Sequence, residues 1–379
     1  MNFNLTEEQL LIKQSARDFA HSVLKPGVIE RDEKAEAPPA QIKQMQEMGF
    51  MGMMANPKYG GQGMDTISYL LVMEELSKID SASSVVVSVQ NSLVNWGLEH
   101  YGNEEQKMKY LKPMASGEAI GAFALSEPEA GSDASMQRTT AIDKGDHYLL
   151  NGTKNWISNA AEEDYFIVMA QTHKEKGYKG INAFIVEKGT EGFELGPQEN
   201  KMGMRASHTH SLMFSNLKLP KENRIGEDGF GFKYAMLSLN GGRMGIAAQA
   251  LGIAQGALDL SVQYAKDRKA FGKPISEHQA IAFKLADMEA ATEAARLLVY
   301  KAGWLKEQGK NYNKASAIAK YMAAETAMKV TTEAVQIHGG YGYVKEYHVE
   351  RLMREAKLTQ IYEGTSEIQQ IIISRELLK

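Results

Sequence analysis

The sequence predicts an α+β multidomain protein: an N-terminal α-helical domain (1–118), a middle β-barrel or sandwich domain (119–228) and a C-terminal antiparallel helix bundle (229–379). Three observations indicate this order. Apolar residues first recur at helical spacing, short β-rich segments with turn residues follow, and long alanine-rich helical stretches complete the chain. At 379 residues the chain is too long for one simple core, so two or three packed units are expected.

The N-terminal unit has the pattern of amphipathic helices. Thr6 and Gln9 have the spacing of a capping box, and apolar residues recur every three or four positions from Ile12 to Val23. The segments PAQIKQMQEMGF and TISYLLVMEELSKI continue the helical pattern. The glycine-rich NPKYGGQGMD between them is expected to form a loop.

Strands are expected in the middle unit, because AIGAFALSE, YFIVMAQT, NAFIVEKG and SLMFSNLKL are short, β-rich and separated by turn residues. DKGD at 143–146 predicts a hairpin turn. Since no β–α–β alternation occurs, a doubly wound parallel sheet is not expected.

The C-terminal unit returns to helical spacing. Apolar residues from Ile281 to Leu298 follow the i, i+3/i+4 rule, and an alanine-rich stretch ends on Gly339, as a helix C-terminus does. Long helices with short connections are typical of an antiparallel bundle.

Composition and motifs exclude several classes of function. The formal net charge of −4 offers no reason to bind nucleic acid or an anionic membrane, and the absence of cysteine excludes disulfides and thiolate metal sites. No Rossmann, P-loop or serine-hydrolase motif is present, and the two histidines of HTH at 208–210 lack a third ligand, so no metal is expected. The N-terminal residues have no apolar core of a signal peptide, which predicts a cytoplasmic and prokaryotic protein.

Two segments of the β unit could line a ligand site. FALSEPEAGSD (123–133) opens as a strand and becomes a loop of hydroxyl groups and exposed amides. This loop either binds a polar ligand or is a turn with polar side chains and no ligand. In NGTKNWISNA (151–160), Trp156 and Ser158 would share one face of a strand. The tryptophan is either a core residue or one wall of a site for a flat heterocycle.

Three further segments lie in the C-terminal unit. DRKAFGKPI (267–275) contains Arg268, whose planar fork suits a diphosphate, although a surface charge cluster is the alternative. QIHGGYGY (336–343) lets a backbone approach a ligand at its glycines. LNGGRMG (239–245) places Arg243 in an otherwise apolar helical stretch, where a buried arginine needs an anionic partner.

QIYEGTSEIQ (360–369) interrupts a helical run at Glu363 and Gly364. Glu363 is either a solvated loop carboxylate or a base directed at a substrate. Gly364 permits a close backbone approach and an unusual φ, while Ser366 with Gln369 has the spacing to cap the helix that follows.

Together these motifs, in this order and over essentially the whole chain, resemble the acyl-CoA dehydrogenase family, and most of all its short-chain, butyryl-CoA-type members. The resemblance implies an FAD-dependent oxidoreductase that holds FAD without a Rossmann fold, between the β domain and the bundle. It implies conversion of a butyryl-CoA-like acyl-CoA to the trans-2-enoyl-CoA, with electrons passed to an electron-transfer flavoprotein. It also implies a homotetramer built as a dimer of dimers, because FAD contacts would come from two subunits.

The resemblance also assigns roles to residues of this chain. Glu363 would be the catalytic base that removes the α-proton of the thioester. The residues implied to bind FAD within one subunit are Phe123, Leu125, Ser126, Trp156, Ser158, Thr365 and Glu367. The residues implied to reach the FAD of a neighbouring subunit are Arg268, Phe271, Gln279, Gln336, Gly339 and Gly340. The residues implied to bind the acyl-CoA are Ser132, Asn240, Arg243, Tyr362 and Gly364, with Arg243 near its nucleotide end.

Basicity is the physical requirement on Glu363. A free glutamate, with a pKa of about 4.3, is a weak base for an α-proton, and burial raises such a pKa towards about 6–7. The nearby helix N-terminus opposes this by about 0.3–1 kcal/mol, so desolvation is expected to dominate in a dry pocket. Some relatives carry the base just before the arginine of the LNGGR helix; Gly242 stands there and cannot titrate.

Three alternatives remain at this stage. An acyl-CoA oxidase would use the same base but reoxidise its flavin with O2. A branched short-chain acyl-CoA dehydrogenase would differ in the acyl pocket. A helical scaffold that only retains the fold would not be an enzyme. For Glu367, a helix N-terminal acid stabilised by the helix dipole is at least as good an interpretation as a cofactor contact.

Overall fold

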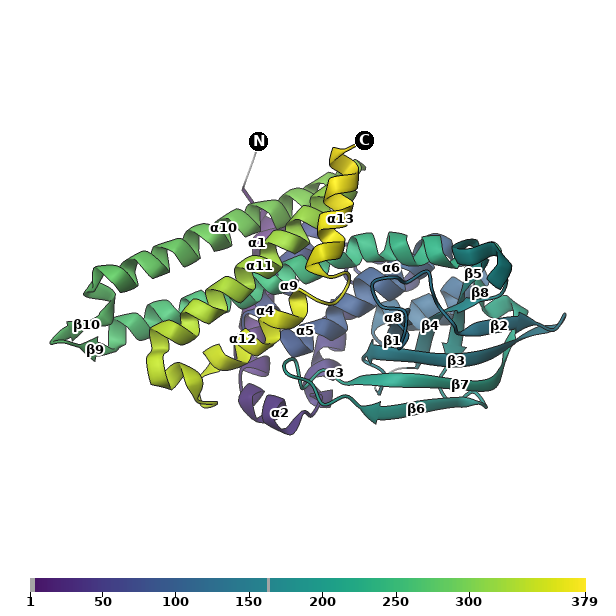
Figure 1. The fold of residues 1–379 in the computed structure, drawn as a ribbon, viewed down its shortest axis with the longest axis horizontal. Helices are drawn as coiled ribbons and strands as arrows, with labels where there is room; N and C mark the ends of the chain where they lie inside the picture. Colours follow the sequence, from purple (N-terminus) through teal and green to yellow (C-terminus); the bar gives the residue numbers. More distant parts are fainter. Residues whose placement is uncertain (1–3, 162–163) are drawn as a thin grey trace.

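The computed structural model describes residues 4–161 and 164–379. Helices precede and follow a β-sheet, so the predicted order of helical, β and helical parts is confirmed (Figure 1). The sheet lies at one end of the elongated molecule and the long helices extend to the other end (Figure 1). No helix in the described part of the chain is long and apolar enough to cross a membrane.

The N-terminal part packs as a layer of helices beside the sheet. Its helices are α1 (Glu7–Phe19), α2 (Val28–Lys34), α3 (Pro39–Glu47), α4 (Thr66–Ser77), α5 (Ser81–Ser88), α6 (Trp96–Tyr101), α7 (Glu104–Gln106) and α8 (Lys112–Ser116). The predicted capping box is present, because Thr6 and Gln9 exchange side-chain and backbone hydrogen bonds of 3.1 Å. A π-helical stretch, Val89–Asn95, joins α5 to α6.

The β part is a mixed sheet whose two halves meet at one residue pair. Its strands are β1 (Gly121–Ala124), β2 (Thr140–Asp143), β3 (His147–Ser158), β4 (Tyr165–Gln171), β5 (Ile181–Glu187), β6 (Phe193–Gln198), β7 (Thr209–Pro220) and β8 (Arg224–Ile225). The strand order is β6-β7-β3-β2-β4-β5-β8, with β1 parallel to β4, and β2 meets β4 only at Thr140 and Gln171. The predicted hairpin turn joins β2 to β3.

Strands β4 and β5 are buried on both faces, so the sheet separates two cores. Phe166 and Val168 of β4 belong to a core made only by the strands and their loops. Ile167 and Met169 between them belong to the larger core shared with the helices. Because successive strand residues point to opposite faces, this one strand joins the β part to the helical parts.

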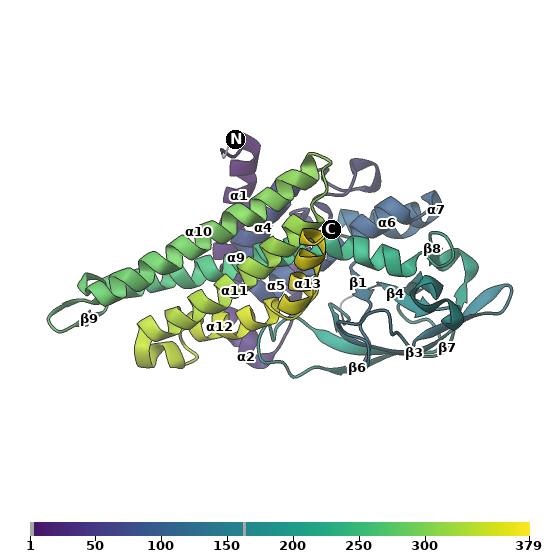
Figure 2. The same cartoon turned by 45° about the horizontal axis from the view of Figure 1, so that its top comes forward.

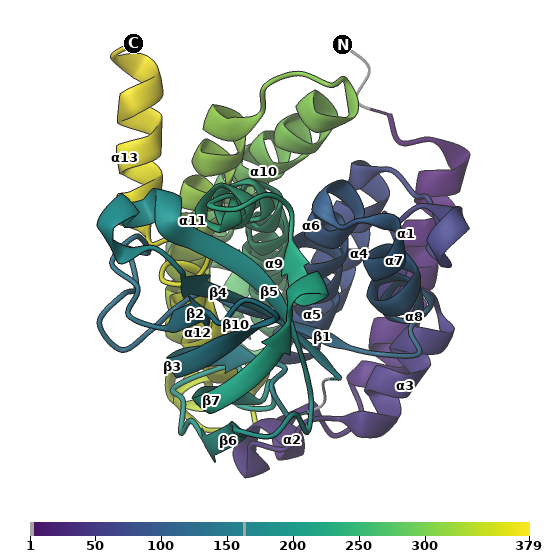
Figure 3. The same ribbon diagram turned by 90° about the vertical axis from the view of Figure 1, so that its right-hand side faces the viewer.

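The C-terminal part is a bundle of long helices. These are α9 (Gly231–Asp267), α10 (Gln279–Glu307), α11 (Asn313–His338), α12 (His348–Thr359) and α13 (Ser366–Leu377). A hairpin of β9 (Lys269–Ala270) and β10 (Lys273–Pro274) joins α9 to α10 at the end of the molecule farthest from the sheet (Figure 2). Gly339 ends α11 with a φ of 59°, as its position in the sequence predicts. Helix α13 projects away from the body beside the sheet (Figure 3).

Helix α9 connects all three parts, because it lies against α4, α5, α11 and β5. Its close contact with α4 requires glycine. A Cβ added to Gly252 or Gly256 would lie 2.4 Å from a backbone oxygen of Glu74 or Lys78. Backbones this close leave no room for a side chain, so glycine is required where α9 packs on α4.

Candidate active site

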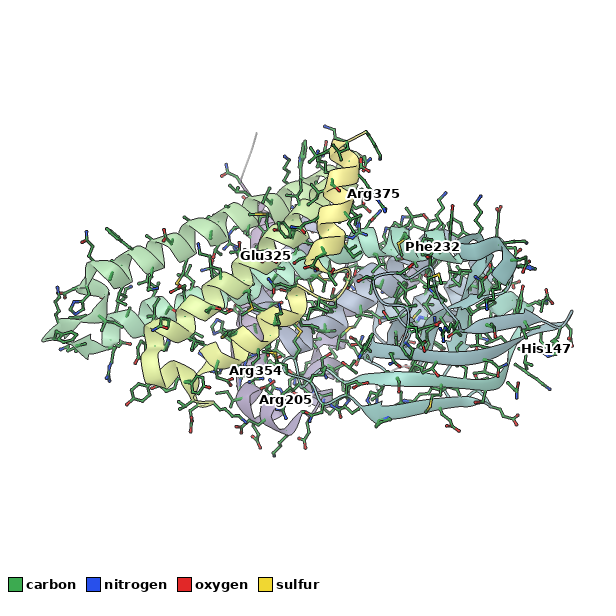
Figure 4. The ribbon with its side chains drawn as sticks, viewed as in Figure 1. His147, Arg205, Phe232, Glu325, Arg354 and Arg375 are labelled. Atoms are coloured by element: carbon green, nitrogen blue, oxygen red, sulfur yellow. The ribbon has the colours of Figure 1, made fainter. Side chains whose placement is uncertain are left out.

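A cavity of about 690 Å³ lies where the helical parts meet the β part. Its walls come from α5 and the π-helical stretch, the β1–β2 loop, β3, the first half of α9 and the connection between α12 and α13. Phe232 of α9 and Arg375 of α13 also line it, and both are labelled in Figure 4. Segments separated by up to 290 positions in sequence therefore form one site.

The structure brings most of the predicted site residues together in this cavity. Those that line it are Phe123, Leu125, Ser126, Ser132, Trp156, Ser158, Asn240, Arg243, Tyr362, Glu363 and Gly364. The predicted residues that do not line it are Arg268, Phe271, Gln279, Gln336, Gly339, Gly340, Thr365 and Glu367.

The α12–α13 connection holds Glu363 in a left-handed conformation. Glu363 has a φ of 50° and Gly364 a φ of 95°, so the unusual backbone expected at the glycine is present. The carbonyl of Gly364 accepts hydrogen bonds from Lys320 Nζ at 2.7 Å and from Gln369 Nε2 at 2.8 Å. A non-glycine residue at positive φ needs such support from its surroundings, because the conformation is disfavoured.

The predicted cap of α13 is wrong by one residue. Thr365, not Ser366, is the N-cap, and its hydroxyl accepts a hydrogen bond from the amide of Ile368 at 3.3 Å. The hydroxyl of Ser366 instead donates to Glu325 of α11 at 2.7 Å, and Glu325 is labelled in Figure 4. The cap falls on Thr365 because that residue is still extended, whereas Ser366 already belongs to the helix.

Glu363 carries an unpaired, buried carboxylate oxygen. As a whole the residue is half-buried, but its Oε2 atom is buried and has no hydrogen-bond partner in the described part of the chain. Burial raises the pKa of this carboxyl to about 7, against the opposing positive charges of Lys320 and Arg243. Desolvation therefore dominates, as the sequence analysis expected, and the group is poised to gain or lose a proton near neutral pH.

Gly242 lies directly against this carboxylate. A Cβ at Gly242 would be 2.0 Å from Glu363 Oε2 and 2.8 Å from Leu93 Cδ2. Any side chain at position 242 would therefore occupy the place of the Glu363 carboxylate. The geometry allows an acid at one of the two positions but not at both in these conformations.

Arg243 lies in the same cavity, and within residues 4–161 and 164–379 no acidic side chain contacts it, contrary to the expected anionic partner. Its Nη1 donates to the amide oxygens of Asn240 at 2.6 Å and Asn313 at 3.2 Å, and its Nε is buried without a partner. Burial lowers the pKa of Arg243 to about 10, although the charge of Glu363 opposes this. A buried guanidinium with a free N–H can bind an anionic or carbonyl oxygen.

Trp156 is not a core residue, so the core interpretation of NGTKNWISNA is wrong. Its side chain is 56% exposed, and a bulge between Lys154 and Ile157 places it at a φ of 58°. The bulge interrupts the strict alternation assumed from the sequence, so Ile157 lines the cavity together with Trp156 and Ser158. An exposed indole and a nearby hydroxyl form one wall of the cavity.

A buried ion pair supports that wall from behind, and sequence reasoning missed it. Lys154 and Glu127 are almost fully buried and lie 2.7 Å apart. Lys154 Nζ also donates to the carbonyl of Leu125 and to Gln137 at 3.0 Å each. The pair thus ties β3 to the loop after β1. The strand HYLLNGTKNWIS is rich in polar residues, so its lysine had no distinguishing local pattern.

The remaining predicted residues lie elsewhere. Arg268 stacks on the ring of Tyr341 at 5.5 Å, and Phe271 at the tip of the β9–β10 hairpin is 96% exposed. This group lies at the end of the bundle far from the sheet (Figure 2). Glu367 is exposed in the first turn of α13, where its own backbone N–H and the hydroxyl of Thr365 lower its pKa. That position fits the helix-terminus interpretation of Glu367.

Comparison with known proteins identifies the family. Family models for the acyl-CoA dehydrogenase N-terminal, middle and C-terminal domains match residues 6–118, 122–217 and 229–378. The chain belongs to the acyl-CoA dehydrogenase family. The resemblance found in the sequence is thereby confirmed.

Relatives within the acyl-CoA dehydrogenase family match the whole chain. The short-chain-specific acyl-CoA dehydrogenase of Clostridium acetobutylicum is 49% identical over 100% of both chains. The structure of butyryl-CoA dehydrogenase from Megasphaera elsdenii is 49% identical over 100% of both chains, with a TM-score of 0.98. A chain in a structure of the electron-transferring flavoprotein of Acidaminococcus fermentans is 51% identical over 100% of both chains, with a TM-score of 0.99.

Membership of the acyl-CoA dehydrogenase family makes this chain an FAD-dependent oxidoreductase. The predicted fold class is confirmed by the same matches. A helical scaffold without catalytic function is therefore not supported.

Proposed function

We propose that the chain oxidises a short-chain acyl-CoA to the trans-2-enoyl-CoA, with Glu363 as the catalytic base. One observation carries this proposal: an unpaired carboxylate oxygen of Glu363 is buried at a cavity that the indole of Trp156 also lines. The relatives named short-chain specific and butyryl-CoA dehydrogenase support the substrate class.

The proposed reaction begins with transfer of the thioester α-proton to Glu363. A pKa of about 7 makes this carboxylate a stronger base than a free glutamate, while it is still largely ionised above neutral pH. We propose that the backbone N–H of Glu363, which belongs to the peptide between Tyr362 and Glu363, donates a hydrogen bond to the thioester carbonyl. Bound FAD supplies the acceptor for the β-hydride.

The cavity wall made by the β part fits a flavin. Trp156 presents an exposed ring on which a flat heterocycle can pack, and the hydroxyls of Ser126 and Ser158 can bind its polar edge. Phe123 and Leu125 complete the apolar part of this wall. We assign these five residues to the isoalloxazine, and we retain Thr365 and Glu367 as proposed contacts farther along the cofactor.

The α9 wall and the Glu363 loop are proposed to bind the acyl-CoA. Asn240 and Arg243 present amide and guanidinium groups to the cavity, and Ser132 adds a hydroxyl from the β1–β2 loop. Tyr362 contributes its ring, because its hydroxyl already donates to Gln249. Gly364 keeps the backbone close to the substrate.

The acyl pocket is proposed to suit a butyryl chain. Val85, Ser88, Val89 and Leu93 line the helical side of the cavity, and the hydroxyl of Ser88 accepts a hydrogen bond from the buried hydroxyl of Tyr69 at 3.5 Å. We expect kcat/KM to be highest for the C4 substrate in a series from C4 to C8 acyl-CoA, measured with an artificial electron acceptor. A maximum at C8 would contradict the short-chain assignment, and a preference for a branched C4 or C5 chain would favour the branched-chain alternative.

The proposed electron acceptor is an electron-transfer flavoprotein. The similar chain in the Acidaminococcus fermentans structure supports this partner, as distinct from the O2 used by an oxidase. We expect substrate-reduced enzyme to react slowly with O2 and rapidly with electron-transfer flavoprotein in stopped-flow mixing. Rapid reoxidation by O2 alone would favour the acyl-CoA oxidase alternative.

A homotetramer, built as a dimer of dimers, is proposed because two groups of predicted FAD contacts lie far apart in one chain. The group around Arg268, Phe271 and Gln279, with Gln336, Gly339 and Gly340, is exposed at the end of the bundle. A neighbouring subunit's cofactor would lie against it. A monomer that retains FAD in analytical ultracentrifugation would contradict this proposal.

The cytoplasmic location stays a prediction.

A further inference from the structure

Lys320 is a buried lysine that the proposed reaction does not yet use. It lies in α11 with no exposed surface, and its Nζ donates to the carbonyl of Gly364 at 2.7 Å. That carbonyl follows Glu363 directly in the chain. A buried ammonium is costly unless its surroundings compensate it, so its presence behind the Glu363 loop requires an explanation.

The hydrogen bond from Lys320 helps to fix the conformation of the loop that carries Glu363. The loop between α12 and α13 holds two successive residues at positive φ, and Lys320 and Gln369 together bind the carbonyl at its turning point. Gln369 is fully buried and also donates to the carbonyl of Glu363 at 3.4 Å. The two donors come from different helices and hold the loop in one conformation.

Its charge gives Lys320 an electrostatic role. The groups facing Glu363 are Lys320 from α11, Arg243 from α9, Tyr69 from α4 and the neighbouring Tyr362. Of these, Lys320 opposes the desolvation of Glu363 most strongly, ahead of Arg243.

Lys320 is itself close to losing its charge. Burial and the charge of Arg243 lower its pKa to about 8, while Glu363, Glu325 and Glu367 raise it. The base and the lysine therefore form a coupled pair within a dry environment.

We propose that Lys320 is a positioning residue for the reaction. It holds the backbone that carries the catalytic base, and its positive charge keeps that base ionised in the water-excluded cavity. This inference rests on the proposed function of Glu363, and it explains how a carboxylate with a buried oxygen can be basic without being permanently protonated.

The first test replaces Lys320 with methionine and compares pH profiles of kcat/KM for butyryl-CoA. Loss of a nearby positive charge raises the pKa of a carboxyl, so the midpoint of the acidic limb should move about one unit to higher pH. At a pH below both midpoints, kcat/KM of the variant, expressed as a fraction of its own high-pH plateau, should be about tenfold lower than the same fraction for the wild type. Lys306→Met is the matched control.

The control removes another buried lysine, in α10. Burial lowers the pKa of Lys306, and its Nζ lies 3.8 Å from the sulfur of Met54, in a separate cavity of about 210 Å³. The wild-type midpoint should be retained in Lys306→Met. An unchanged midpoint in Lys320→Met, or an equal shift in both variants, would overturn the proposal.

Two further variants separate the hydrogen bond from the charge. Lys320→Gln retains an N–H donor without a charge, and it should show the raised midpoint. Lys320→Arg retains the charge, and it should keep a midpoint near that of the wild type. If neither Lys320→Met nor Lys320→Gln folds, the acidic-limb midpoint of Lys320→Arg decides. A midpoint higher than that of the wild type overturns the electrostatic role, and a midpoint equal to that of the wild type supports it.

An infrared titration distinguishes failure of this inference from failure of the proposed function. The protonated carboxyl stretch of Glu363, assigned by its absence in Glu363→Gln, reports the ionisation of this group without turnover. If the wild type did not oxidise butyryl-CoA, the proposed function would fail while this titration still measured the effect of Lys320. If turnover occurs and Lys320→Met leaves the infrared midpoint unchanged, only the inference fails.

Discussion

Glu363→Gln is expected to lower kcat for butyryl-CoA at least about 10³-fold, within the range that loss of a general base causes. The amide has nearly the same shape, but it cannot accept the α-proton. Oε2 of Glu363 is buried without a hydrogen-bond partner among the described residues, and Asp133, the other acid that lines the cavity, is exposed in the β1–β2 loop. The rate should be measured as flavin bleaching in a single turnover, so that product release does not obscure the chemical step.

Two observations make this result interpretable. The flavin absorbance and content of Glu363→Gln should equal those of the wild type, because the β wall that binds the isoalloxazine is unchanged. Glu105→Gln, at an exposed position in α7, should leave the rate unaltered. Turnover of Glu363→Gln at the wild-type rate would mean that Glu363 is not the base.

Lys154→Met is expected to destabilise the protein by about 3–5 kcal/mol, the usual cost of breaking one side of a buried ion pair. The substitution would leave the carboxylate of Glu127 almost fully buried without its cation. Glu127 would keep its bonds to the amides of Arg138 and Thr139, at 2.6 Å and 3.1 Å, which compensate only part of the loss. Urea unfolding of the enzyme at fixed FAD concentration measures the change.

The double variant Glu127→Gln/Lys154→Met provides the decisive comparison. Removing both charges leaves no buried, unpaired ion, so the double variant should be more stable than Lys154→Met alone. Lys144→Met, at an exposed position in the β2–β3 turn, should change stability by less than about 0.5 kcal/mol. A Lys154→Met variant as stable as Lys144→Met would show that the pair does not hold the loop after β1.

Much of the site was accessible from the sequence because its residues occur in short, distinctive segments. Glu363 followed by Gly364 is recognisable as a break in a helical run, and the structure places both at positive φ. The pairing of Trp156 with Ser158 on one wall was also predicted. The bulge that exposes Trp156 was not, because a register shift depends on the partner strand β7 rather than on the residues of β3 alone.

The supporting residues were not accessible in the same way. Lys320 and Gln249 lie on regular helices, where a polar residue in an alanine-rich stretch has no distinguishing local pattern. Their importance depends on what packs against them: Gly364 against Lys320, and Tyr362 against Gln249. The residues in these two contacts are separated in sequence by 44 and by 113 positions. Contacts over such separations cannot be inferred from periodicity.

The sequence alone determined the order of helical and β parts, the family, and which carboxylate is proposed as the base. These depend on local patterns: the period of apolar residues, the turn chemistry and the identity of short motifs. Only the tertiary structure decided that the carboxylate is basic, because its pKa is set by the loss of water around Glu363 and by the charges of Lys320 and Arg243. Desolvation is a property of all the segments that close around a group, and no single segment of the chain contains it.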